Sequence, residues 1–290
     1  MKNIMLAAVI IAGCHGAKID DAHDDESPKS NNVSYLCVGM ETSMRFGSCP
    51  GCEIDAKRIH SMMKDKFGYK GEILISGQAT KSAVVERLSS GVDRTPEGGL
   101  FLFFYSGHGG QENLGGKEPD GADRMDEYLC LYDAHMLDDE IWDIVSKCRG
   151  RVFLYFDACH SATMYRSVAL DVSRSPDVAE ALALSTNTMV KSSGFSFRPR
   201  DIFLARALEA DSRGCLPNIL CWSGCKESEY SYGGSGGGTL TTAVVYSWRK
   251  GMSYESLWEI AATRVRRSQP GQNPVQTHIG VFSGDTEAFR

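Results

Sequence analysis

Two residues that could carry out nucleophilic catalysis follow two apolar runs of this sequence. His108 comes shortly after Leu100–Tyr105, and Cys159 comes shortly after Val152–Phe156. A cysteine thiolate attacks acyl carbons, and a histidine beside it can orient the thiol and protonate a leaving amine. The pair is therefore a candidate catalytic dyad for cleaving amide bonds. The non-catalytic alternative is a buried structural cysteine and a hydrogen-bonded loop histidine.

The two apolar runs must bring this pair together. Each run is almost continuously apolar, which is typical of a strand buried on both faces of a parallel sheet. Functional groups of such sheets gather beyond the carboxyl ends of the strands. Two neighbouring parallel strands would therefore place His108 and Cys159 at the same edge of the sheet.

The remaining periodicity predicts one α/β domain over residues 33–290. The alternation of strands and helices before the dyad favours a parallel sheet with right-handed crossovers. The predicted strands cover 33–39, 72–76, 100–105, 128–132, 152–156, 218–223 and 277–282. The predicted helices cover 53–67, 80–88, 138–147, 201–210, 239–249 and 253–267, and the predicted loops include 109–126, 163–200 and 231–238. We expect a mostly parallel central sheet of about six strands with helices on both faces.

The residues around the dyad form two short motifs. Tyr105–Gly109 reads YSGHG, and Asp157–Ser161 reads DACHS. These motifs resemble those of the caspase-like (clan CD) cysteine peptidases, and most closely those of the metacaspases, where D-x-CHSG is usual and Gly takes the place of Ala162. His108 precedes Cys159 by 51 residues (159 minus 108), close to the spacing of about 50 that is typical of caspases.

The resemblance extends, through less specific motifs, over residues 35–282. The further similar segments are Gly51–Ala56, Asp126–Leu129, Leu137–Ile141 and Asn273–Gln276. It implies a three-layer caspase-like α/β fold and a cysteine endopeptidase. The alternatives are a catalytically silent caspase-fold module used for binding, and a clan relative that prefers another residue, such as Asn, before the scissile bond.

The resemblance also assigns roles around the dyad. The backbone N–H groups of Gly109 and Cys159 would form the oxyanion hole. The primary specificity pocket, which receives the side chain before the scissile bond, would be formed by Cys52, Asp55, Ser106 and Asp157. Two carboxylates there favour a cationic side chain, so cleavage after Arg or Lys is expected. In the alternative, Asp55 and Asp157 are helix-cap or loop carboxylates.

An acidic cluster resembles the calcium site of the family. The cluster consists of Asp126, Asp138, Asp139 and Glu140. Because hard oxygen ligands suit Ca²⁺, we expect calcium to act as an activator. The chemistry of the dyad itself is expected to need no cofactor. Arg166 stands where the family has a further Asp. The alternative is that the acidic residues only begin a helix, where they interact well with its dipole.

The long serine-rich loop contains basic residues that an enzyme of this specificity could cut in its own chain. These candidate self-processing sites are Arg166, Arg174, Lys191, Arg198 and Arg200. The alternative is an uncut, exposed loop, since metacaspase-like enzymes can act as single chains.

The first 32 residues have a different character from the rest. Residues 1–14 combine a basic start, a short apolar core and a final Cys14, which is typical of a secretory signal and resembles a bacterial lipobox. Residues 15–32 are polar and acidic, which is typical of a disordered tether. We expect export to the periplasm or outside the cell, with a possible membrane anchor on a lipidated Cys14. The alternatives are a signal cut elsewhere and an incidental apolar leader.

Charge and cysteine content narrow the remaining possibilities. The net charge of −6 over 290 residues disfavours a nucleic-acid binder, so the expected partners are protein or peptide substrates, and a monomer is favoured. Among the ten cysteines, Cys49 pairs by spacing with Cys52, and Cys221 with Cys225. Local disulfides or buried thiols are the favoured interpretation of these pairs, and a zinc site is the alternative.

Overall fold

The computed structural model describes residues 32–113, 125–160, 189–194, 217–226 and 229–290. The predicted signal segment, nearly all of the tether and the predicted helix over 201–210 lie outside these residues. Within the described part of the chain, no helix is long and apolar enough to cross a lipid bilayer.

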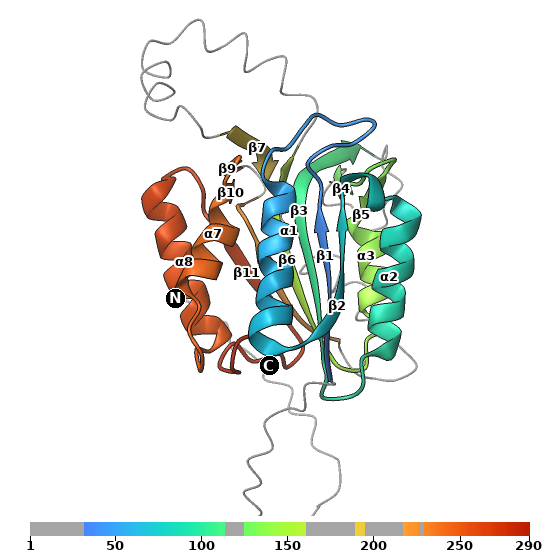
Figure 1. Ribbon diagram of the computed structural model, residues 1–290, viewed down its shortest axis with the longest axis vertical. Helices are drawn as coiled ribbons and strands as arrows, with labels where there is room; N and C mark the ends of the chain where they lie inside the picture. Colours follow the sequence, from blue (N-terminus) through green and yellow to red (C-terminus); the bar gives the residue numbers. More distant parts are fainter. Residues whose placement is uncertain (1–31, 114–124, 161–188, 195–216, 227–228) are drawn as a thin grey trace, which may run out of the picture.

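Six strands form the central part of the sheet, which is the middle layer of the fold (Figure 1). In spatial order these strands are β2 (Lys70–Ile75), β1 (Val33–Gly39), β3 (Leu100–Asn113), β6 (Arg151–His160), β8 (Asn218–Ser223) and β11 (Val275–Ile279). The first five strands are parallel and only β11 runs antiparallel to its neighbour. The predicted mostly parallel sheet is thereby confirmed.

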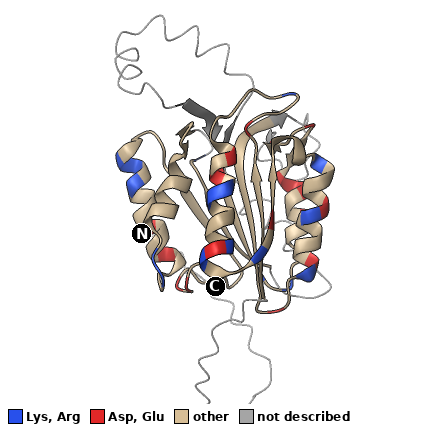
Figure 2. Ribbon diagram, in the orientation of Figure 1, with Lys and Arg blue, Asp and Glu red and all other residues tan. Residues whose placement is uncertain are grey.

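Helices cover both faces of this sheet. One face carries α1 (Cys52–Ser61), which continues as a π-helix over Met62–Lys66, together with α7 (Thr239–Ser247) and α8 (Tyr254–Ser268). The other face carries α2 (Lys81–Arg94) and α3 (Asp138–Val145). Figure 2 shows the charged residues gathered mainly on the helices, while the central strands carry almost none. The result is the three-layer arrangement that the resemblance implied.

The apolar strands alternate their side chains between the two layers of helices. Leu102 and Phe104 of β3 pack in the cluster with α1, α7 and α8, whereas Phe103 and Tyr105 pack in the cluster with α2 and α3. A strand with helices on both faces needs apolar residues at every position, which explains the continuous run. Even-numbered positions of β3 therefore belong to the face of α1 and α7.

A set of shorter strands extends the sheet at the carboxyl ends of β3 and β6. On one side β4 (Met125–Cys130) pairs with β3, and β5 (His135–Leu137) pairs with β4. On the other side β7 (Met189–Gly194) pairs with β6, β9 (Tyr230–Gly234) with β7, and β10 (Gly237–Gly238) with β9. All five pairings are antiparallel.

The predictions of loops over 109–126, 163–200 and 231–238 were wrong in part. β3 runs on to Asn113, β7 falls within the second segment, and β9 and β10 fall within the third. These strands are rich in glycine and serine and lack apolar alternation, so they carry no local strand signal. Their hydrogen-bonding partners come from distant parts of the chain.

Gly51 is a position where only glycine fits, and its replacement gives a test of the fold. Its φ is +92°, and a Cβ there would meet the carbonyl oxygen of Gly234 and lie 2.7 Å from the nitrogen of Gly237. We expect Gly51→Ala to lower the free energy of unfolding by about 3 kcal/mol or more, through backbone strain and overpacking together. Urea denaturation measures the change.

Gly68→Ala is the matched control for this substitution. Gly68 also has a positive φ, +72°, but a Cβ there meets nothing within 4 Å. Strain alone should cost about 1–2 kcal/mol. Equal losses in the two variants would show that the close approach of the 234–237 turn to α1 does not matter for stability.

Candidate functional site

The structure places His108 and Cys159 opposite each other. In the register of the parallel pair β3 and β6, His108 lies beside Cys159, Gly109 beside His160, and Ser106 beside Asp157. The two residues lie within the strands, not beyond their ends as the sequence suggested, because both strands continue past their apolar runs. The side chain of Cys159 lies outside the described part of the structure.

His108 is held by the ends of neighbouring segments. Its Nε2 atom lies 3.3 Å from the carbonyl oxygen of Ser48, in the segment before α1. The hydroxyl of Tyr105 lies 2.7 Å from the carbonyl oxygens of both His108 and Cys130, which ties the end of β3 to β4. The imidazole is only partly buried, so it remains within reach of a substrate.

Gly109, a predicted oxyanion-hole residue, lies between two strands. It is opposite Leu129 of β4 and His160 of β6. Its role in binding an oxyanion, together with the N–H of Cys159, stays a prediction, since these contacts describe the backbone pairing alone.

Asp55 and Ser106, two of the predicted pocket residues, are in direct contact. Both side chains are fully buried, and the Ser106 hydroxyl donates to Asp55 Oδ2 at 2.8 Å. The backbone N–H of Gly238, which is the N-cap of α7, donates to the same carboxylate, at 2.8 Å from each oxygen. Asp55 thus links α1 and β3 to the start of α7.

Asp157 binds the same helix end from the sheet. Its carboxylate is fully buried. Thr241 donates to Oδ2 from its backbone N–H at 2.9 Å and from its hydroxyl at 2.7 Å, and Ser231 donates to Oδ1 at 3.1 Å. The amide groups and dipole at a helix N-terminus stabilise negative charge. Both carboxylates therefore cap the N-terminus of α7, which is the alternative role predicted from the sequence. This capping role is compatible with a second role in a specificity pocket.

Sequence reasoning missed several residues that build this site. Gln272 is fully buried and donates to Ser231 Oγ at 3.0 Å and to the carbonyl oxygen of Gly224 at 2.8 Å. It therefore supports Asp157 through Ser231. Gln272 directly precedes the family-like segment Asn273–Gln276, and that position was the one available signal.

Arg58 was also missed, and it holds the turn before α7. Its Nη1 atom donates to the carbonyl oxygen of Gly236 at 2.6 Å and to Thr242 Oγ1 at 3.3 Å. Asp55 and Arg58 lie one helical turn apart on α1, so an acid and a base of one helix bind the two ends of the turn 236–238. This clamp sets the position of α7 against the two carboxylates.

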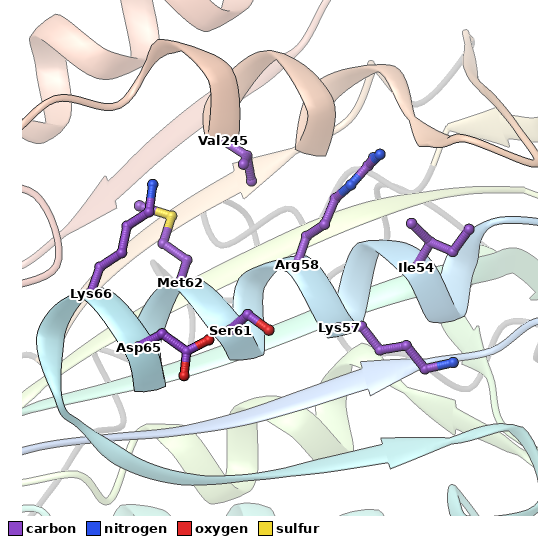
Figure 3. Close-up of a pocket in the computed structure, with 8 residues that line it drawn as sticks. All are labelled: Ile54, Lys57, Arg58, Ser61, Met62, Asp65, Lys66 and Val245. Carbon is purple, nitrogen blue, oxygen red and sulfur yellow. The ribbon is translucent and has the colours of Figure 1, made fainter.

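A cavity of about 380 Å³ lies between α1 and α7 (Figure 3). Its lining includes Arg58, Met62 and Lys66 from the α1 side and Val245 from α7. None of the residues predicted to act in catalysis or substrate binding lines it, so we do not assign it to the substrate.

Cys52, the remaining predicted pocket residue, lies against Cys49. Cys52 begins α1, and its thiol donates to Cys49 Sγ at 2.8 Å. Cys221 and Cys225 make other contacts, to Ser223 Oγ and to the carbonyl oxygen of Glu229. Burial raises the pKa of the Cys221 thiol to about 12, whereas a metal-bound cysteine is a thiolate.

The described residues contain no cluster of three or more His, Cys, Asp or Glu side chains that could hold a metal ion. The zinc alternative therefore finds no support there. Of the predicted calcium ligands, Asp138, Asp139 and Glu140 begin α3, and Glu140 accepts from Lys81 Nζ at 2.7 Å and from the N–H of Leu137 at 2.9 Å. The side chain of Asp126 lies outside the described set, so calcium binding stays a prediction.

The candidate self-processing sites are placed only in part. Lys191 lies in β7, which pairs with β6 and β9. The other four candidates lie outside the described residues, and they are Arg166, Arg174, Arg198 and Arg200.

Known proteins with similar sequences include metacaspases. Metacaspase-1 of Cryptococcus neoformans is 24% identical over 253 residues, which cover 73% of this chain and 54% of that protein. Metacaspase-1A of Aspergillus clavatus is 28% identical over 263 residues, covering 77% and 61% of the two chains. This chain thus spans little more than half the length of these relatives.

The fold is also found in a solved structure. The crystal structure of protein GSU0716 from Geobacter sulfurreducens matches with a TM-score of 0.61 at 23% identity, covering 85% of this chain and 93% of the other. The caspase domain family matches residues 35–279, a range that runs from within β1 to the end of β11 and includes every predicted dyad and pocket residue. The chain therefore belongs to the caspase domain family, and within it is most similar to the metacaspases.

Proposed function

We propose that this protein is a cysteine endopeptidase that cuts after Arg or Lys. The observation that carries the proposal is the register of β3 and β6, which sets His108 beside Cys159 and Ser106 beside Asp157. Strand alternation assigns all four positions to one face of the sheet. A candidate nucleophile, a candidate acid–base and a buried carboxylate thus belong to a single surface.

The proposed reaction uses these residues in two steps. The thiolate of Cys159 attacks the carbonyl carbon of the scissile bond, and His108 donates a proton to the leaving amine. A water molecule, deprotonated by His108, then attacks the acyl-enzyme and releases the new carboxylate and the thiol. The backbone N–H groups of Gly109 and Cys159 are the proposed donors to the oxyanion in both steps.

The proposed preference for Arg or Lys rests on Asp55 and Asp157. Both carboxylates are buried, and both are held in place by the N-terminus of α7. A fixed pair of buried negative charges attracts a cationic side chain and repels an anionic one. Ser106, which donates to Asp55, and Cys52, which precedes Asp55 by three residues on α1, complete the proposed pocket.

Hydrolysis of paired fluorogenic peptides tests the proposal. The reduced full chain should cleave a peptide that ends in Arg, leave the matched Asp peptide intact, and lose the activity in Cys159→Ala. Like-charge contacts cost several kcal/mol, so we expect a preference of about 10³-fold or more for Arg. Cleavage of neither peptide by the folded protein would favour the catalytically silent module, and cleavage after Asn would favour the clan relative.

Calcium enters the same assay as an additional comparison. We keep it as a proposed activator because Asp138, Asp139 and Glu140 lie together at the start of α3. Equal rates of cleavage with calcium and with a chelator would refute the proposal that calcium is an activator. Export and lipidation of Cys14 stay predictions from the sequence, as this segment lies outside the described residues.

A further inference from the structure

We propose that Cys49 and Cys52 form a redox-active dithiol, which a low-molecular-weight disulfide such as oxidised glutathione converts reversibly into an intrachain disulfide. The two residues enclose a tight turn, Cys49-Pro50-Gly51-Cys52. The turn depends on the positive φ of Gly51. Neither the dyad nor the fold explains why a second cysteine stands at position 49.

The distance between the two sulfur atoms is the first observation. Cys52 Sγ lies 2.8 Å from Cys49 Sγ, and the N–H of Cys52 donates to the carbonyl oxygen of Cys49 at 3.3 Å. A disulfide bond is about 2.05 Å long. The sulfur atoms therefore need to approach by less than about 1 Å, which side-chain rotation and small shifts of the turn can supply.

Cys52 differs from four of the other described cysteines in lying at the start of a helix. Cys52 begins a ten-residue helix, and a helix N-terminus stabilises a thiolate. Cys37, Cys130, Cys148 and Cys221 lie within the sheet or against it, and burial raises the pKa of each of their thiols. A raised pKa disfavours the thiolate, which is the form that attacks disulfides.

An exposed segment gives a reagent its route to the pair. Both cysteines are buried, at 3% and 0% exposure, but the segment just before them is open, with Met44 at 71%. This segment is held by Glu41, whose carbonyl oxygen accepts from the N–H of Cys49 at 2.8 Å and whose carboxylate accepts from Gly51 at 3.2 Å. Movement of this exposed segment would uncover Cys49 without unfolding the sheet.

The reaction is an ordinary thiol–disulfide exchange. One protein thiolate attacks a sulfur atom of the oxidised reagent RSSR, forms a mixed disulfide and releases RS⁻, which takes up the proton lost by the protein thiol. The second protein thiol, after losing its proton, displaces the remaining RS⁻ and forms the Cys49–Cys52 bond. The reagent is reduced to two RSH, and the two cysteines are oxidised by two electrons in total.

The bond would act on the proposed active site, and this part of the inference rests on the proposed function. The carbonyl oxygen of Ser48, the residue before Cys49, lies 3.3 Å from His108 Nε2. Cys52 belongs to the proposed specificity pocket. Drawing the two sulfur atoms together would shift both Ser48 and Cys52. Misplacing a catalytic group by 1 Å can cost about 10²-fold in rate. Oxidation should therefore lower peptidase activity.

Mass spectrometry of the full chain tests the bond without reference to activity. The protein is exposed to oxidised glutathione, alkylated after acid quenching, and digested with trypsin. Residues 46–57 form one tryptic peptide that contains Cys49 and Cys52 and no other cysteine. We expect this peptide to be two hydrogens lighter than the reduced peptide and to regain both thiols after dithiothreitol. Two alkylated thiols, or glutathione on one cysteine alone, would overturn the inference.

Activity measured on the same samples tests the effect on the dyad. Cleavage of the Arg peptide should fall by about tenfold or more on oxidation, recover with dithiothreitol, and stay unchanged in Cys49→Ser, which retains the pocket residue Cys52. Cys159 is the single cysteine of the tryptic peptide 152–166, so any modification of Cys159 is measured separately. Full activity of the cross-linked form would overturn the regulatory part, and an inactive reduced protein would count against the proposed function alone.

Discussion

Cys159→Ala should lower kcat for a peptide ending in Arg by at least about 10³-fold, because it removes the atom that forms the acyl-enzyme. His108→Ala should lower kcat by about 10²–10⁴-fold, the usual contribution of an acid–base group. The double variant should be no slower than Cys159→Ala alone, since the two residues act as one unit and their effects do not add. Steady-state kinetics on all three variants measure this.

The matched control for these variants is another buried cysteine of the same sheet. Cys221 lies in β8, next to the strand of Cys159, and is almost fully buried. Cys221→Ala should lower the free energy of unfolding by about 1–2 kcal/mol through the small cavity it leaves, with kcat changed little. Substantial activity in Cys159→Ala, or a loss in Cys221→Ala as large as in Cys159→Ala, would refute the assignment of the nucleophile.

Asp157→Asn should remove the preference for a cationic side chain. Two matched peptides expose this effect, one ending in Arg and one ending in citrulline, which has nearly the same shape without the charge. The ratio of their kcat/KM values should fall by about 10²-fold or more, because a buried interacting charge pair is worth about 2–5 kcal/mol. Cleavage of the citrulline peptide should change much less.

A second variant separates the pocket from the helix cap. Thr241→Val removes the hydroxyl that donates to Asp157 at 2.7 Å, but leaves the backbone N–H and the carboxylate in place. It should lower the free energy of unfolding by about 1–3 kcal/mol, with the ratio of Arg to citrulline unchanged. If Asp157→Asn also lowered stability without changing that ratio, Asp157 would be a helix cap and nothing more.

The cavity between α1 and α7 is separate from the residues that these experiments change. It lies beside Arg58, which binds the turn 236–238, but it contains neither dyad residue nor either carboxylate (Figure 3). Asp157→Asn therefore changes the proposed pocket without changing the lining of this cavity.

The sequence predicts well the parts of the fold whose signal is local. The continuous apolar runs identify β3 and β6, because strands covered on both faces need apolar residues throughout. Thr80, a residue type that favours helix N-caps, caps α2, and its hydroxyl accepts from the N–H of Ala83 at 3.3 Å. Where the signal is weak the predictions failed, as for β7, β9 and β10, whose glycine and serine residues are typical of loops.

The chain by itself determined which residues could do the chemistry, since the types and spacing of His108 and Cys159 and the motifs around them are visible without a structure. Only the tertiary structure decided what surrounds them. Asp55 and the N–H of Gly238 are separated by 183 residues, and Asp157 and Thr241 by 84. No local pattern encodes such contacts, because they arise when the largely buried α7 packs on the sheet and its N-terminal amides need buried acceptors. The approach of Cys49 to Cys52 is local and was suggested by spacing, but the place of their turn beside His108 was not.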